Sequence, residues 1–258
     1  MNTLPTLSDT KRAFYAAHTR PLNSIYRRVV EELMVEMHLL GVNATFTYDS
    51  VYALGVVTSF DRFMDGYRPS EDVDSIFGAL CQAVGREASQ YRRDAEQAIA
   101  VAQALSGEDL IQLFTLEGVP AASGELGSLV ARLSDSPTFK YSRLFAIGLF
   151  NLLDTAAPEM VKESEPRNAI LDRISAALHL PQEKLKKDIE LYQSNLEKMG
   201  QAKLLMEEMT QVERKKREQR AQEKAAKAAA KATENPTESP ETIATGEETP
   251  GDSPAGDA

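Results

Sequence analysis

Residues 21–41 read PLNSIYRRVVEELMVEMHLLG, and this stretch decides the fold class. Its apolar residues recur every three or four positions, which is the period of an amphipathic α-helix. Pro21 suits the first turn of such a helix, and Gly41 is a typical residue just after the last turn. The charged residues between positions 27 and 32 fall on the outer side. The residues of the predicted buried stripe are Leu22, Ile25, Val29, Leu33, Met37 and Leu40.

The helical period continues on both sides of this stretch, and no alternating segment predicts a sheet. Residues 46–48 are the exception, because they favour an extended backbone, but one short segment cannot build a sheet. Ser70 is expected to cap a helix, and prolines at 158 and 166 are expected to interrupt the helices between 156 and 166. We predict an all-α fold whose multi-helix globular domain spans residues 1–180. The other expected helices are 9–18, 50–65, 70–84, 87–105, 107–115, 124–133, 138–155 and 167–179.

From Pro181 onward the apolar residues follow the rhythm of a coiled coil. The rhythm shifts near Gly200 and resumes at Ala202, Leu205, Met209 and Val212. This pattern predicts one long C-terminal helix, residues 181–232, that is coiled-coil-like and then basic. Two alternatives are open for its apolar seam, which either packs back onto the globular domain or pairs with a second chain. The first residues of the seam are spaced 4-3-4-3 and are Leu185, Ile189, Tyr192, Leu196 and Met199.

Charge is unevenly distributed after this seam. Residues 214–231 hold eight Lys or Arg and two Glu, a net charge of +6, whereas residues 233–258 hold seven acids and no base. The segment 233–258 is rich in Pro, Glu and Thr and has little to bury, so it is predicted to be a disordered acidic tail.

The basic helix has three possible roles: a solvated extension, contact with an anionic membrane surface, or binding to nucleic acid. Nucleic acid is the least favoured, because no aromatic residues are interleaved and the chain carries a net charge of −10. The candidate membrane-surface residues are Arg214, Lys215, Lys216, Arg217 and Arg220.

The composition limits the cellular setting. The longest nearly apolar run, residues 144–153, is half the length of roughly twenty residues that a membrane-spanning helix needs, and the N-terminus shows neither a signal peptide nor a transit peptide. Membrane association is therefore expected to be peripheral. Cys81 is the only cysteine, which fits a reducing compartment. It lies in an apolar run, so it is expected to be buried.

The sequence lacks the residue patterns that catalysis requires. None of His18, His38 and His179 follows a Glu by three positions, and no zinc motif is present. The glycines at 118, 124 and 127 match neither a phosphate-binding loop nor a dinucleotide fingerprint. We therefore expect a protein that is not an enzyme, with no catalytic residue, no cofactor and no metal site.

Three blocks of sequence resemble the thylakoid formation family, also called the photosystem II biogenesis proteins of cyanobacteria and chloroplasts. The first block is SDTKRAFYAAHTRP at 8–21 with NSIYRRVVEEL at 23–33 and EMHLL at 36–40. The second is FTYDSVY at 46–52 with FDRFMDGY at 60–67, and the third is YSRLFAIGL at 141–149. The similarity covers roughly residues 6–215, and the tail after Thr233 lies outside the family pattern.

This resemblance implies a peripheral, all-helical protein on the cytoplasmic or stromal face of thylakoids. Such proteins support photosystem II biogenesis and repair, and are associated with accumulation of the thylakoid FtsH-type protease. The family has no catalytic residues to carry over. Plant members have a transit peptide, so the chain resembles the cyanobacterial form and is expected on the cytoplasmic side of the thylakoid membrane.

The first block also supplies candidate residues for contact with an FtsH-type protease complex or with photosystem II assembly intermediates. The alternative is an ordinary solvated face with Arg27–Glu31 and Arg28–Glu32 pairs. The candidate partner-binding residues are Lys11, Arg12, Arg20, Arg27 and Arg28.

The competing functional prediction is that the chain is a structural membrane-surface protein, which organises thylakoid lipid through the basic helix.

Overall fold

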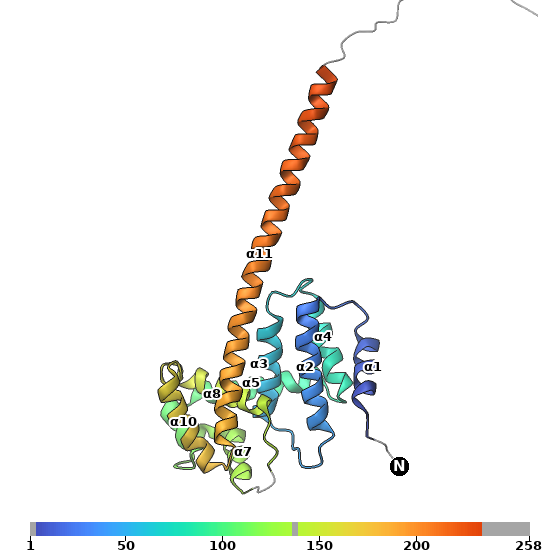
Figure 1. The fold of residues 1–258 in the computed structure, drawn as a ribbon. Helices are drawn as coiled ribbons and strands as arrows, with labels where there is room; N and C mark the ends of the chain where they lie inside the picture. The colour runs from blue at the N-terminus through green and yellow to red at the C-terminus, as the bar shows by residue number, and fades with distance from the viewer. Residues whose placement is uncertain (1–3, 136–138, 234–258) are drawn as a thin grey trace, which may run out of the picture. The chain divides into compact units, whose positions relative to one another are not determined.

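The computed structural model of the chain describes residues 4–135 and 139–233 (Figure 1). Within these ranges the regular structure consists of helices and contains no strand, so the predicted all-α fold is confirmed. Residues 46–48 are not a strand either. The α-helices are α1 (Leu7–Ala17), α2 (Ser24–Gly41), α3 (Ser50–Met64), α4 (Asp72–Ala83), α5 (Ala88–Ala104), α6 (Gly107–Phe114), α7 (Gly124–Ser134), α8 (Arg143–Ala156), α9 (Pro158–Val161), α10 (Ser164–Ala177) and α11 (Gln182–Thr233), and one 3-10 turn, η1, spans Ala121–Ser123.

Side chains just before the helices fix several of these starting points. Asp49 accepts a hydrogen bond from the Tyr52 N–H at 2.7 Å, and Ser142 accepts one from the Phe145 N–H at 3.0 Å. α8 therefore begins at 143, later than the expected 138. The expected cap at Ser70 is wrong, because α4 begins at Asp72 and its first turn has no side-chain cap. Pro166 does not interrupt a helix, since it lies in the first turn of α10, where proline is tolerated.

Helix α3 is the centre of the core. It is buried along most of its length and packs chiefly on α8 and α5. Two glycines permit the closest approach. A Cβ at Gly55 would lie 1.7 Å from the Leu144 carbonyl oxygen, and one at Gly148 would lie 1.9 Å from the Val51 carbonyl oxygen. The two backbones therefore touch at a crossing that only glycine allows.

The other helices surround this crossing on two sides (Figure 1). On one side α2 packs on α3, and α1 packs on both α2 and α4. On the other side α6 and α9 pack on α8, while α10 contacts α6 and α9. α7 completes this side through contacts with α5 and α6.

The buried face of α2 is rotated relative to the predicted stripe. Leu33, Met37 and Leu40 are buried as expected, but Ile25 and Val29 are only half-buried. Their places in the core are taken by other apolar side chains of the same helix, because that face meets the helices packed against it. These residues are Tyr26, Val30 and Met34.

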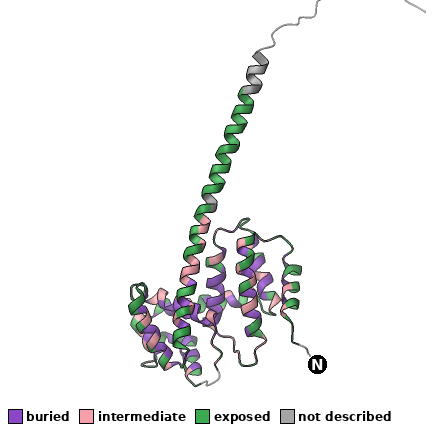
Figure 2. Cartoon of the chain, viewed as in Figure 1, coloured by how far each residue is buried: buried purple, intermediate pink, exposed green. Residues whose placement is uncertain are grey.

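The first turns of α11 belong to the globular body. Leu185, Ile189 and Tyr192 are buried, and Figure 2 shows buried residues at the start of this helix. Of the two alternatives for the apolar seam, its first residues, 185–192, therefore pack onto the globular body. The compact unit extends to Lys203, beyond the boundary expected at 180, and residues from Leu204 form a separate unit.

The second unit has exposed side chains wherever the structure describes them, over 204–205 and 208–226 (Figure 2). The expected disordered tail, 233–258, falls outside the described residues apart from Thr233, which ends α11. Among the helices of the described residues, none is both long enough and apolar enough to cross a membrane.

Candidate functional site: a charged cleft and an apolar groove

The structure separates the five predicted partner-binding residues into three places. Lys11, Arg27 and Arg28 line one wide hollow, whereas Arg12 and Arg20 do not belong to its lining. Arg12 forms an ion pair with Asp9 of its own helix, and Arg20 forms one with the buried Asp72 at the start of α4. The five residues therefore do not form a single cluster.

Two helix-surface pairs were expected, and one of them forms. The Arg28 Nε donates to the Glu32 carboxylate at 2.9 Å, as predicted. Arg27 and Glu31 form no ion pair within the described residues. Glu31 instead accepts hydrogen bonds from Lys11 at 3.3 Å and from the Tyr15 hydroxyl at 2.8 Å. These contacts lower the pKa of Glu31, chiefly through the hydrogen bond from Tyr15. Glu31 thus joins α1 to α2.

The wide hollow, called here the charged cleft, has a volume of about 1030 Å³. It lies along α2 and is also lined by Tyr141, Ser142 and Arg143 at the start of α8 and by Lys184 and Asp188 of α11. Its lining includes five cations and four carboxylates. The cations are Lys11, Arg27, Arg28, Arg143 and Lys184, and the carboxylates are Glu31, Glu32, Glu36 and Asp188.

Arg143 and Glu36 form an ion pair in the lining of the charged cleft, and neither was among the predicted partner-binding residues. The Arg143 Nη2 lies 2.7 Å from the Glu36 Oε2, and its Nε lies 3.1 Å from the same atom. The Leu144 N–H donates to the other carboxylate oxygen at 3.3 Å. Glu36 thus ties α2 to the first turn of α8. Glu36 and Arg143 are 107 positions apart in the sequence, so local spacing could not reveal this pair.

A further hydrogen bond joins Tyr141, which lies just before α8, to α11. The Tyr141 hydroxyl donates to the Asp188 carboxylate at 2.7 Å, and the Lys184 ammonium lies 5.2 Å from the Tyr141 ring centroid. Burial, with the neighbouring Asp188, raises the pKa of Tyr141. The phenol therefore stays protonated and keeps its role as a hydrogen-bond donor.

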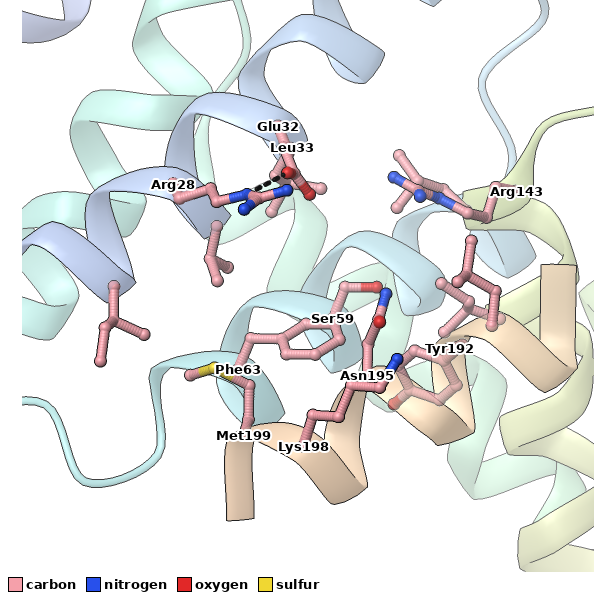
Figure 3. Close-up of a pocket in the computed structure, with 15 residues that line it drawn as sticks. Arg28, Glu32, Leu33, Ser59, Phe63, Arg143, Tyr192, Asn195, Lys198 and Met199 are labelled. Atoms are coloured by element: carbon pink, nitrogen blue, oxygen red, sulfur yellow. Dashed lines mark hydrogen bonds and ion pairs between the residues drawn. The ribbon is translucent and has the colours of Figure 1, made fainter. Parts of the chain in front are cut away.

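A narrower hollow, called here the apolar groove, lies beside the charged cleft and has a volume of about 500 Å³ (Figure 3). Its walls are formed by α2 and α11, and its floor by α3 and α8. Ile25 and Val29, which were predicted to be core residues, line it together with Phe63, Ile147 and Met199. The half-buried face of α2 is therefore one wall of a hollow.

Polar groups lie at the base and the rim of the apolar groove. The Ser59 hydroxyl is buried and has no hydrogen-bond partner within the described chain. Figure 3 shows Arg28 and Arg143 at one rim and Lys198 at the other. Burial raises the pKa of Tyr192, which also lines the groove, to about 12, so its hydroxyl is neutral. The groove can hold an apolar occupant that brings negative charge to its rim.

The five residues predicted to contact a membrane surface lie in the unit that begins at Leu204. Arg214 donates to Glu218 at 3.0 Å, one turn further along the helix. Lys215, Lys216, Arg217 and Arg220 have exposed side chains.

The histidines and the cysteine do not converge on one site. The His38 Nδ1 lies 2.9 Å from the Thr10 hydroxyl, and the His18 Nδ1 lies 3.1 Å from the Ser75 hydroxyl. Cys81 is buried, as predicted, and burial raises the pKa of its thiol to about 12. Among the described residues, no three His, Cys, Asp or Glu side chains are placed to hold a metal ion.

Comparison with known proteins supports the family suggested by the sequence. The sequence profile of the family described as Thylakoid formation protein matches residues 6–221. The chain belongs to this family. Protein Thf1 of Trichormus variabilis is 55% identical over 222 residues, which cover 86% of this chain and 95% of that protein. Protein Thf1 of Gloeothece citriformis is 56% identical over 223 residues, covering 85% and 97% respectively.

A solved structure of this family has the same fold. The structure of Psb29 is 45% identical to this chain and superposes with a TM-score of 0.70. The match covers 83% of this chain and 98% of the Psb29 chain. The thylakoid formation fold is therefore shown for most of the chain.

Proposed function

We propose that this protein is a non-enzymatic accessory factor in photosystem II biogenesis and repair and in thylakoid membrane biogenesis. It acts as a peripheral protein on the cytoplasmic side of the thylakoid membrane, where it binds and stabilises an FtsH-type protease complex. Membership of the thylakoid formation family supports the process. The charged cleft is the observation that supports binding to a partner.

The ion pairs of the charged cleft differ in how easily they can be exchanged. The Lys11–Glu31 and Arg28–Glu32 pairs are solvent-accessible, and such pairs contribute about 0–1 kcal/mol to stability. A partner's carboxylate can replace Glu31 or Glu32 at little cost. The Arg143–Glu36 pair is more buried. Two hydrogen bonds join its side chains, and Glu36 accepts a third from the Leu144 N–H, so this pair holds the shape of the cleft.

The environment of the reactive side chains supports an accessory role over catalysis. Within the part of the chain that the structure describes, the Nδ1 atoms of His18 and His38 contact the hydroxyl groups of Ser75 and Thr10, and not a carboxylate that would orient a general base. The Cys81 thiol is buried with a raised pKa, which disfavours the thiolate that a nucleophile requires. These environments of the two histidines and the cysteine are consistent with a protein that binds a partner through its surface and catalyses no reaction.

Recovery of the protease from solubilised thylakoid membranes tests the proposal. A variant with Lys11→Glu, Arg27→Glu and Arg28→Glu reverses the cations of α1 and α2 in the charged cleft. We expect it to recover roughly tenfold less FtsH-type protease than the wild type, because reversed charges repel the partner. Circular dichroism of the purified variant checks that its helices are intact.

The matched control reverses three exposed cations outside the charged cleft, with Arg68→Glu, Arg93→Glu and Lys162→Glu. It carries the same change in net charge, so it should recover the protease as the wild type does. Equal recovery by the wild type and the cleft variant would reject the charged cleft as the binding site. Failure of the wild type to recover any protease would reject the proposed partner.

The alternative function, organisation of thylakoid lipid through the basic helix, is favoured by the exposure of Lys215, Lys216, Arg217 and Arg220. Each basic residue near an anionic surface contributes about 1 kcal/mol of attraction. Under this alternative, the full chain floats with vesicles that contain anionic lipid, and changing these four residues to Gln abolishes flotation. A wild-type chain that remains with the unbound fraction at low salt rejects it.

A further inference from the structure

The part of α11 that follows Lys203 carries apolar side chains in contact with solvent. Leu204, Leu205, Met209 and Val212 are 64%, 59%, 60% and 63% exposed. Scattered single apolar residues are normal on a surface, but a group of four within nine positions marks a surface that another molecule covers. Positions 205, 209 and 212 follow the i, i+4, i+7 spacing of one helix face.

The charge of this segment indicates what kind of surface it binds. Glu208 and Glu213 are exposed beside the apolar residues, and no basic residue lies between Lys203 and Arg214. Residues 204–213, called here the acidic segment, are therefore an amphipathic helix with negative charge. An anionic lipid surface would repel it, whereas an apolar surface with a cationic rim would attract it.

The apolar groove has the complementary properties. Its walls are two helices and its floor is formed by two more, which is the setting in which an amphipathic helix binds in a groove. Its lining includes three cations, Arg28, Arg143 and Lys198, and one carboxylate, Glu32, although the chain as a whole carries a net charge of −10. Arg28 pairs with Glu32 and Arg143 with Glu36, so Lys198 is the cation of this lining to which the described residues offer no ion pair. The unpartnered Ser59 hydroxyl at its base offers a hydrogen bond to a polar group of the occupant.

We infer that two copies of this chain associate, with the acidic segment of each copy bound in the apolar groove of the other. Both surfaces are present on every copy, so two reciprocal contacts complete a closed two-fold dimer. Such a dimer covers the exposed apolar residues and places Glu208 and Glu213 near cations. The inference does not rest on the proposed function. Arg28, Glu32 and Arg143 line both hollows, but the tests below change Asn195, Lys198 and the acidic segment, which lie outside the charged cleft.

Sedimentation velocity of the full chain over a range of concentrations tests this inference. We expect the wild type to change from monomer to dimer as concentration rises. A variant with Leu205→Ser and Met209→Ser should raise the dimer dissociation constant roughly tenfold or more, because it removes apolar contacts at the centre of the interface. Both positions are exposed in the single copy, so these changes should leave the folded monomer intact. Val119→Ser is the control, because Val119 is 78% exposed and lies outside the groove.

Charge reversal gives a sharper test because it separates self-association from association between variants. One variant makes the charge of the groove negative, with Asn195→Glu and Lys198→Glu. The other makes the charge of the acidic segment positive, with Glu208→Lys and Glu213→Lys. In each variant alone, groove and segment carry the same sign of charge, so each should be monomeric. When the two are mixed, both reciprocal contacts join opposite charges, and native mass spectrometry should detect a heterodimer.

Three results would overturn the inference. The first is a wild-type chain that stays monomeric at every concentration. This result overturns the inference even if the acidic segment binds vesicles or another protein. The second is a dimer that the Leu205→Ser, Met209→Ser variant forms as tightly as the wild type. The third is a mixture of the two charge variants in which no heterodimer appears although each variant is folded by circular dichroism.

Discussion

Helix α11 consists of two stretches with similar apolar spacing and opposite environments. Within residues 182–203, Leu185 and Ile189 are fully buried in the globular body, whereas Met209 and Val212 in the following stretch are more than half exposed. Both stretches repeat apolar residues at intervals of three and four. The comparison teaches that periodicity specifies a helix with an apolar face, while the partner of that face depends on the rest of the fold.

The largest expected effect concerns the closest packing in the buried body. Gly55→Ala places a methyl group 1.7 Å from the Leu144 carbonyl oxygen, and backbone cannot move aside as a flexible side chain can. We expect α3 and α8 to separate and the free energy of unfolding to fall by about 3 kcal/mol or more. Urea denaturation followed by circular dichroism measures this loss.

Gly78→Ala is the control for this substitution, because a Cβ at Gly78 of α4 meets no atom within 4 Å. It should raise stability by up to about 1 kcal/mol, the difference in helix propensity between alanine and glycine. Equal stabilities for the two alanine variants would contradict the close crossing of α3 and α8.

The second expected effect compares the two stretches of α11 directly. Ile189→Ala removes a fully buried side chain and should lower the free energy of unfolding by about 2–5 kcal/mol. Met209→Ala changes an exposed residue, so the stability of the monomer should change by less than about 0.5 kcal/mol. Thermal or chemical denaturation of both variants at low concentration checks the difference. Similar losses in both would show that the second stretch is packed as well.

The third prediction concerns a carboxyl group buried in the body. Burial raises the pKa of Asp49 to about 6, against the lowering effect of hydrogen bonds from the Tyr52 and Val51 N–H groups. Its pKa in the unfolded chain is about 3.9. Between these values the folded chain holds a proton that the unfolded chain has lost, so stability falls as pH rises from about 4 to 6.

Asp49→Asn keeps an oxygen that can cap α3 and removes the titration. We expect the variant to exceed the wild type in stability by about 3 kcal/mol at about pH 8, and this difference to become small near pH 4. Val119→Ser, which changes no titratable group and lies at an exposed position, is the control and should show a nearly constant difference. Denaturation curves at several pH values measure the free energy of unfolding of each chain. A difference between Asp49→Asn and the wild type that does not change with pH would contradict the raised pKa.

The smallest expected effect lies at Gly200, near the end of the packed stretch of α11. A Cβ there meets no atom within 4 Å, so Gly200→Ala adds helix propensity without a steric cost. We expect a gain of about 1 kcal/mol in the stability of this helix, measured by hydrogen exchange of its amides. A loss of protection would show that the glycine serves another purpose.

The sequence predicted most helices because helix formation depends on local spacing and end residues. The position of α5 was expected at 87–105 and is Ala88–Ala104, and that of α6 was expected at 107–115 and is Gly107–Phe114. The buried face of α2 was harder to predict. Tyr26, Val30 and Met34 are as apolar as Ile25 and Val29, so two rotations of the helix were equally consistent with the pattern.

The candidate site depended on contacts between distant segments, which local patterns do not contain. Arg28–Glu32 was predictable because it joins one turn of a helix to the next. Glu31 contacts α1 instead of Arg27, and Arg143 reaches Glu36 across 107 positions. The family resemblance included Arg143 in its third block, but only the fold shows which residue it contacts.

The buried state of Cys81 has a practical consequence for these experiments. It is the only cysteine in the chain, and at neutral pH burial keeps its thiol protonated and away from solvent. Thiol-reactive dyes and spin labels should therefore leave the native chain unmodified. A single cysteine introduced at an exposed position such as 209 would then be labelled selectively, without first removing the natural one.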